Sequence, residues 1–243
     1  MFSDTENNAP LTTLTLFGYD SSSAKTWAFL QMGLAGFELA KTPGLRFWKL
    51  LGSGEGGGFS LKPNFSRYGL FAVWDTPEAA NHFFNESKLM QKYRRRAAEI
   101  WTIKMLPTKA HGLWSKKNPF SALAETKLDA PVAVLTRARI HTTKLRRFWA
   151  HVPATSAEIA KAENLIASIG IGEAPFVRQA TFSLWRDEQS MQNFAYKSPI
   201  HRETIRKTRA EHWYAEELFA RFVPVASEGT WNGRDPLAGF FDE

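Results

Sequence analysis

Short runs in which apolar and polar residues alternate occur in two groups along the chain, and each group also contains two helical stretches. The expected strands are 14–19, 46–51, 68–74 and 101–106 in the first group and 132–139, 165–169, 178–185 and 214–223 in the second. Helical spacing of apolar residues covers 26–40, 77–98, 142–162 and 188–209. Each group therefore has the order βαββαβ, which is that of a ferredoxin-like unit.

The two groups are copies of one unit. When residues 67–84 are placed on 178–195 without a gap, Trp74 falls on Trp185 and Phe83 on Phe194, a shift of 111 positions in both cases (185 minus 74, 194 minus 83). Downstream, the residues up to Trp114 match those up to Trp231. Such internal similarity indicates a duplicated supersecondary unit.

We therefore predict an α+β fold in which two tandem ferredoxin-like units pack their sheets face to face as a pseudo-dimeric α/β barrel. The predicted boundaries are a first unit over 11–114, a linker over 115–130, a second unit over 131–231 and a C-terminal tail over 232–243. Two separate domains joined like beads on a string are the alternative, because contact area between domains cannot be read from a sequence.

Composition limits the chemistry. The chain of 243 residues has no cysteine, which excludes disulfides, cysteine-ligated zinc, iron–sulfur clusters and thiolate-ligated haem. Any metal must be held by His, carboxylate, Tyr, Met or Lys. Residues 1–10 are polar and acidic, and no apolar run approaches the ~20 residues of a spanning helix, so we expect a cytoplasmic protein.

The net charge of +7 suits an anionic membrane surface, nucleic acid or an ordinary soluble surface. The third strand of the second unit lacks the aromatic pattern with which RNA-binding ferredoxin-like units stack bases, so nucleic acid is not expected as a partner. Peripheral contact with the inner membrane stays open.

The glycine-rich segment 52–57 formally contains the G-x-G-x-x-G pattern of dinucleotide sites. That pattern requires a helix directly after the glycines, whereas a strand is expected here. A hairpin connection between two strands is the better interpretation.

One of the six histidines differs from the others in its expected surroundings. His201 shares a helix face with Phe194 and Ile205, so periodicity points it inward, and its counterpart 111 positions earlier is Met90. From periodicity alone, a histidine packed in a core is more common than a metal ligand. Lys49 is also unusual, because it alternates with Trp48 along a half-buried strand and so points into a polar or ligand-filled space.

Three stretches, 42–55, 169–185 and 194–222, resemble the spheroidene monooxygenase family, and the resemblance covers nearly the whole chain after the first ten or so residues. It implies a haem b (iron) oxygenase that installs a keto group, by way of a hydroxyl, on an acyclic carotenoid such as spheroidene. It also implies kinship with dimeric α/β-barrel haem proteins, in which a helical histidine binds the iron.

Carried onto this sequence, the resemblance makes His201 the expected iron ligand. Trp48, Trp185 and Tyr196 fall in family-like segments and are expected beside the cofactor, and Lys49 and Arg178 are the expected hydrogen-bond donors to bound oxygen. O2 is the co-substrate, and an external electron donor such as a ferredoxin is required because no reductase motif is present.

Two other functions stay open on the sequence. One is a haem-dependent dehydratase acting on a small nitrogenous substrate. The other is a ligand-binding α/β-barrel protein without catalytic activity.

Overall fold

The structure is a computed structural model that describes residues 10–56, 60–120, 124, 130–197 and 199–241. For residues 155, 196, 197 and 199–201 it describes the backbone alone. Everything below concerns this part of the chain.

The two copies have the same succession of elements. Those of the first half are β1 (Leu11–Gly18), α1 (Ser22–Leu34), α2 (Gly36–Leu39), β2 (Leu45–Gly54), β3 (Pro63–Trp74), α3 (Pro77–Glu86), α4 (Lys88–Arg94) and β4 (Glu99–Gly112). Those of the second half are β5 (Val132–Ile140), η1 (Thr142–Lys144), α5 (Leu145–Ile159), β6 (Leu165–Ala174), β7 (Arg178–Trp185), α6 (Glu188–Lys197), α7 (Pro199–Ala210) and β8 (Tyr214–Gly229).

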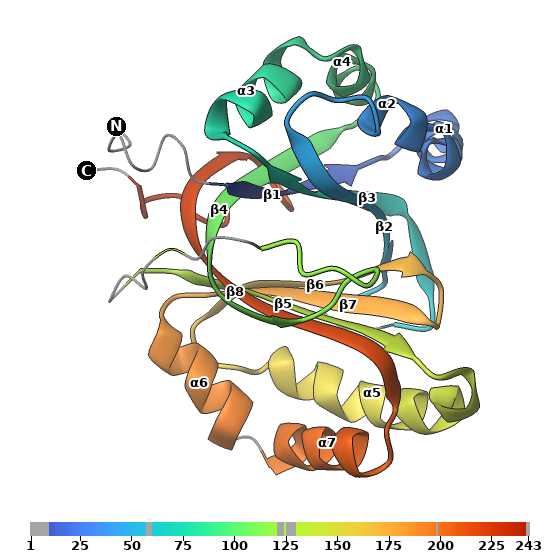
Figure 1. The fold of residues 1–243 in the computed structure, drawn as a ribbon, viewed down its shortest axis with the longest axis vertical. Coiled ribbons are helices and arrows are strands. Elements are labelled where there is room, and N and C mark those ends of the chain that lie inside the picture. The colour runs from blue at the N-terminus through green and yellow to red at the C-terminus, as the bar shows by residue number, and fades with distance from the viewer. Residues whose placement is uncertain (1–9, 57–59, 121–123, 125–129, 198, 242–243) are drawn as a thin grey trace.

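All eight strands form one closed antiparallel barrel in the order β1-β3-β2-β6-β7-β5-β8-β4 (Figure 1). Each half has the strand order of a ferredoxin-like sheet, and its helices cover the outer side of its own sheet. The halves join along β4 and β8 from Trp101↔Gly229 to Gly112↔Leu218, and along β2 and β6 at Gly52↔Gly172 and Ser53↔Ile171. The predicted pseudo-dimeric α/β barrel is confirmed, and the bead-like arrangement is excluded.

The barrel interior is a packed apolar core. Alternate strand residues from both halves, such as Leu14, Phe71, Leu135 and Phe182, have an exposed fraction of 1% or less there. Burying side chains of this size stabilises the fold by about 1.5–3 kcal/mol each. Because apolar side chains fill the middle of the interior, we expect the functional site at the ends of the barrel or on its outer faces.

The chain after each closing strand folds into a barrel end. Trp114 follows β4 and Trp231 follows β8, and both are buried in the barrel core. Phe120 from the predicted linker and Leu237 from the predicted tail join the same core. These two segments are therefore part of the folded barrel at those positions; residues 121–123 and 125–129 of the linker lie outside the described residues.

The prediction of one continuous second helix per unit is wrong in both copies. In the first half, Ser87 has extended backbone (ψ 136°), and its hydroxyl accepts a hydrogen bond from the amide of Met90, so α4 begins anew. In the second half, Pro199 begins α7, because proline has no amide hydrogen to continue a preceding helix.

Candidate functional site

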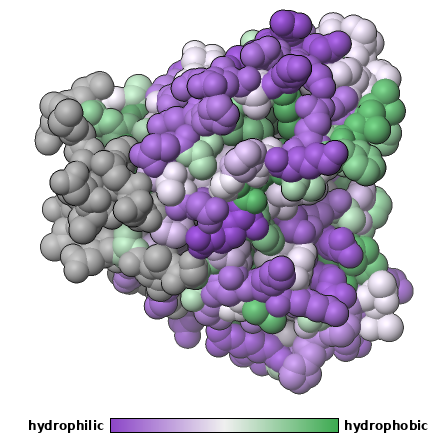
Figure 2. Space-filling model, turned by 45° about the horizontal axis from the view of Figure 1, so that its top comes forward, coloured by the Kyte–Doolittle hydropathy of each residue, from purple (hydrophilic) through white to green (hydrophobic). Residues whose placement is uncertain are grey.

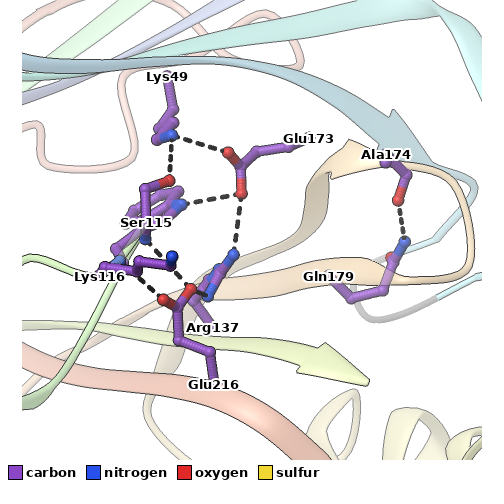
Figure 3. A network of polar contacts seen from close by, with 9 residues as sticks. Lys49, Ser115, Lys116, Arg137, Glu173, Ala174, Gln179 and Glu216 are labelled. Carbon is purple, nitrogen blue, oxygen red and sulfur yellow. Dashed lines mark hydrogen bonds and ion pairs between the residues drawn. The ribbon is translucent and has the colours of Figure 1, made fainter. Parts of the chain in front are cut away.

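A cluster of four charged side chains lies inside one end of the barrel. This lumen cluster consists of Lys49, Arg137, Glu173 and Glu216, one from each of β2, β5, β6 and β8 (Figure 3). The ammonium of Lys49 lies 2.9 Å from Oε1 of Glu173, and the Arg137 guanidinium lies 3.2 Å from Oε2 of the same carboxylate. Arg137 also pairs with Glu216. Two positive and two negative charges thus compensate one another.

The turn after β4 closes this end of the barrel. Ser115 and Lys116 both have positive φ, 56° and 63°, and their amides donate to the Glu216 carboxylate at 3.1 and 2.8 Å. The indole of Trp114 donates to Glu173 at 2.9 Å. The cluster is therefore tied to the backbone as well as to its own counterions.

Burial decides the electrostatics of the lumen cluster. The Arg137 side chain is 3% exposed, and those of Glu173 and Glu216 are 11% and 10% exposed. Burial by itself raises the pKa of Glu173, but hydrogen bonds from Lys49 and Trp114 and the nearby positive charges outweigh it and lower the pKa. The pKa of Glu216 is lowered in the same way, against burial, by the amide of Lys116 and by Arg137. Both carboxylates are therefore ionised at neutral pH.

A cavity of about 220 Å³ opens where β2 and β6 meet, and we call it the seam pocket. Its walls come from α1, the β2–β3 hairpin and the β6–β7 hairpin. Glu173, which belongs to the lumen cluster, also lines this pocket. Gln179 lines it as well, and its side-chain amide donates to the carbonyl of Ala174 at 3.2 Å (Figure 3).

The outer faces of the two sheets differ in the size of their side chains. β3 pairs with β1 in the same register in which β7 pairs with β5, because Leu11↔Trp74 corresponds to Val132↔Trp185. Further along the same strands the first half has Thr13↔Ala72, Thr15↔Leu70 and Phe17↔Tyr68, whereas the second has Val134↔Ser183, Thr136↔Thr181 and Ala138↔Gln179. Leu70, Phe17 and Tyr68 of the first half are thus replaced by the smaller or polar Thr181, Ala138 and Gln179 in the second.

The packing beneath the helices follows this difference. In the first half one continuous buried cluster fills the layer between sheet and helices, and in it Phe17 lies 4.5 Å from Tyr93 of α4 between ring centroids. Among the described side chains of the second half, the layer holds two clusters, one around Val134 and Trp185 and one around Ile140 and Phe148. Thr136 and Ala138 lie between Val134 and Ile140 along β5.

The structure places the predicted site residues in different parts of the molecule. Trp48 packs in the core outside the first sheet, and Trp185 packs outside the second sheet with its ring 5.2 Å from Phe194. Lys49 faces the lumen cluster at one end of the barrel interior, as its alternation with Trp48 predicts. Arg178 begins β7 and is exposed.

His201 lies in α7, on the outer side of the second sheet, and its side chain lies outside the described residues, as does that of Tyr196 in α6. The matching residue of α4, Met90, is 2% exposed and packs in the core. Lys49 is inside the barrel, so the backbone of the sheet separates it from α7. The structure does not bring these two predicted residues to one cavity.

Sequence reasoning missed Arg137, Glu173 and Glu216. A signal was present for Arg137, because strict alternation along β5 puts it on the same inward face as Ala133 and Leu135, where a charge requires a partner. The partners themselves could not be read from the sequence, because they lie 36 and 79 positions away along the chain.

Within the described residues, no group of three or more histidine, aspartate or glutamate side chains is arranged to hold a metal ion. Haem needs one axial side chain, so this finding does not bear on haem. None of the helices in this part of the chain combines the length and apolar character needed to cross a membrane.

Two solved structures of aldoxime dehydratases share the architecture over most of the chain. One has a TM-score of 0.59 at 8% identity and covers 92% of this chain and 83% of that one. The other, in complex with butyraldoxime, has a TM-score of 0.58 at 9% identity and covers 98% and 86%. At such identities the likeness shows the fold alone.

Curated relatives are much more similar in sequence, although no protein-family model matches the chain. Spheroidene monooxygenase from Rhodobacter capsulatus is 40% identical over 231 residues, which are 94% of this chain and 96% of that protein. The enzyme of the same name from Cereibacter sphaeroides is 39% identical over 226 residues, covering 93% of this chain and 70% of the relative. That from Rubrivivax gelatinosus is 36% identical over 212 residues, covering 87% and 81%. The chain is a monooxygenase that belongs to the spheroidene monooxygenase family.

Proposed function

We propose that this protein is a haem-dependent monooxygenase that converts a methylene group of an acyclic carotenoid, such as spheroidene, into a ketone by way of an alcohol. The observation that carries the carotenoid substrate is the identity of 39–40% to spheroidene monooxygenases over more than nine-tenths of the chain. Haem is proposed from the sequence resemblance and from the packing of the second half.

The residues of the second half fit a flat, largely apolar group between sheet and helices. Ala138 and Thr181 take the places of Phe17 and Leu70, so the side chains that this part of the sheet presents to the helices are smaller. With no cysteine in the chain, histidine is the suitable axial ligand, and His201 occupies the α7 position whose counterpart in α4 points into the core. We propose that His201 would hold the iron and that Ala138 and Thr181 would line the haem site.

Bound haem would supply the reductive activation of O2 that carotenoid oxidation requires. The chain's own contribution is a dry, apolar surface on which the hydrocarbon is held with one methylene in place. Arg178, exposed at the start of β7, alternates with the core residues Ala180 and Phe182 and so begins on the same side of the sheet as Lys49. Neither is proposed as a donor at a haem on the outer face.

The stoichiometry requires a separate reductant. Each hydroxylation consumes one O2, two electrons and two protons, breaks one C–H bond and releases one water. A second hydroxylation at the same carbon gives a geminal diol, which loses water to form the ketone. We propose a one-electron donor protein such as a ferredoxin as the source of these electrons.

The test is production of the protein in cells that make an acyclic carotenoid, with analysis of the pigments and of the haem absorption of the purified protein. We expect keto-carotenoid and a Soret band from the unchanged protein, and loss of both in His201→Ala. The control is His151→Ala on the neighbouring helix α5, whose ring already contacts the Arg147 carbonyl and Lys207. Loss of the Soret band in the control alone would refute the ligand assignment. Formation of keto-carotenoid by the purified protein without an electron donor would refute the proposed monooxygenation with an external reductant.

A further inference from the structure

We propose that the seam pocket is the place where a section of the carotenoid chain binds as it enters the enzyme. This inference rests on the proposed function for the identity of the ligand, and on the geometry of the pocket for its location. The ligand class is a long, uncharged polyene hydrocarbon.

Aromatic side chains from both halves stand exposed at the rim of the seam pocket. Phe29 of α1, Phe65 of β3 and Phe176 of the β6–β7 turn line it and are 57%, 56% and 43% exposed. The rings of Phe29 and Phe65 meet edge to face at 6.1 Å, so the rim is an organised surface. Hydrophobic side chains gather over α1 along the right-hand edge of the view in Figure 2. Exposed aromatic groups around a cavity favour binding of an apolar ligand.

The backbone of Phe176 is held in a costly conformation. Its φ is +66°, in the left-handed region that bulky residues rarely adopt. The indole of Trp149 donates to its carbonyl at 3.2 Å, and the two rings lie 6.3 Å apart. A glycine would adopt this turn without strain, so the strain at Phe176 points to a role for its phenyl ring.

Charge in the pocket argues for an uncharged ligand. Of the described residues that line it, Glu173 alone carries a charge. That carboxylate is already compensated by Lys49 and Arg137. An ionic ligand would therefore find no free counter-charge at the inner side of the pocket, whereas a hydrocarbon would pair with the apolar walls at no electrostatic cost.

The seam pocket is continuous with the sheet surface on which haem is proposed. Gln179 lines the pocket and pairs across the strands with Ala138, which begins the stretch of small side chains. Phe176, on the same rim, contacts α5 through Trp149. The pocket therefore borders the outer face of β5 and β7, on which haem is proposed.

The size of the cavity limits what it holds. About 220 Å³ is below the 300–1,000 Å³ of pockets that enclose a whole drug-sized ligand, so a carotenoid would place only a section of its chain here. The remainder would lie along the exposed aromatic rim and the sheet face.

The first test fills the pocket. A Cβ atom at Gly52 has only the Gly172 carbonyl oxygen nearby, at 3.9 Å, so Gly52→Leu would occupy the cavity without backbone strain. We expect the Kd for carotenoid, measured by quenching of tryptophan fluorescence, and the KM to rise about tenfold while kcat changes little. Gly33→Leu is the matched control, because a Cβ there meets nothing within 4 Å and Gly33 lies on the exposed side of α1.

The second test separates binding from folding. Phe176→Gly removes one wall of the rim and the left-handed strain together, so we expect weaker carotenoid binding with a Tm that is unchanged or higher. If the substitution merely damaged the fold, carotenoid binding would weaken and the Tm would fall as well.

The outcomes distinguish this inference from the proposed function. Wild-type affinity and KM in Gly52→Leu and Phe176→Gly, while the native protein still makes keto-carotenoid, would overturn the seam pocket as the binding place. Carotenoid binding that these variants weaken, in a protein that oxygenates no carotenoid, would leave the pocket standing and overturn the function. If both variants bound carotenoid-free anionic lipid vesicles more weakly than the native protein but kept its carotenoid affinity, the rim would be assigned to a membrane surface. That result would also overturn the inference.

Discussion

At the scale of single residues, Arg137 is the side chain on which the barrel end depends most. It is 3% exposed and compensates two carboxylates that are themselves about one-tenth exposed. A buried ion pair adds little net stability compared with apolar packing, but removal of one partner leaves buried charge without compensation. The cost of a substitution should therefore exceed that of an ordinary surface change.

We expect Arg137→Met to lower the free energy of unfolding by about 3–5 kcal/mol, because Glu216 loses its charged partner and Glu173 retains only Lys49. Urea unfolding followed by circular dichroism measures this. Arg139→Met, an exposed position on the same strand, should change stability by no more than about 0.5 kcal/mol. Similar small changes in both variants would show that solvent already screens the cluster.

The lowered pKa values of Glu173 and Glu216 predict a dependence of stability on pH. A carboxyl whose pKa is lower in the folded than in the unfolded state stabilises the fold fully above the unfolded value, about 4.3, and this contribution is lost as pH falls below it. Unfolding free energies measured between pH 7 and pH 3 should decrease most steeply below about pH 4.3. Glu173→Gln should flatten that decrease, and an unchanged slope would contradict the assignment.

At the scale of elements, alternation and helical spacing located every strand, because each strand buries one face on the barrel core and the other under helices. The ends were less well predicted. β4 continues to Gly112 and β8 to Gly229, well past the predicted 106 and 223, because they pair with each other across the two halves. A pairing partner in the other copy leaves no mark in the local pattern of either strand.

The break between α3 and α4 depends on one capping hydroxyl. Ser87→Ala removes the acceptor for the Met90 amide and should lower the free energy of unfolding by about 1 kcal/mol. Thermal or urea unfolding would detect this change. Ser22→Ala, at an exposed position in the first turn of α1, is the matched control and should leave stability within about 0.5 kcal/mol of the original. An equal effect in both variants would exclude a capping role for Ser87.

At the scale of the whole molecule, the two copies share one interior. Leu14 and Phe71 of the first half and Leu135 and Phe182 of the second belong to the same buried cluster. We therefore expect thermal unfolding as a single transition, with coincident curves from far-ultraviolet circular dichroism and tryptophan fluorescence. Two separated transitions would indicate that each half is stable alone, which a shared core does not allow.

The candidate site also forms only when the two halves come together in the folded chain. Lys49 and Glu173 are 124 positions apart (173 minus 49), and the seam pocket takes its walls from both copies. The sequence indicated that Lys49 faces a polar space, but it did not indicate which carboxylate lies there. Likewise, the sequence did not show that Thr136 pairs with Thr181 and Ala138 with Gln179, because these pairings depend on the register of the strands.

The sequence by itself determined the duplicated βαββαβ unit, the inward and outward faces of its strands and the family resemblance, because each of these is written in local periodicity or in matching segments. The tertiary structure decided the closure of the barrel, the partners of Arg137 and the seam pocket. These depend on which distant residues meet when two curved sheets close on one core, and no short-range pattern records that choice.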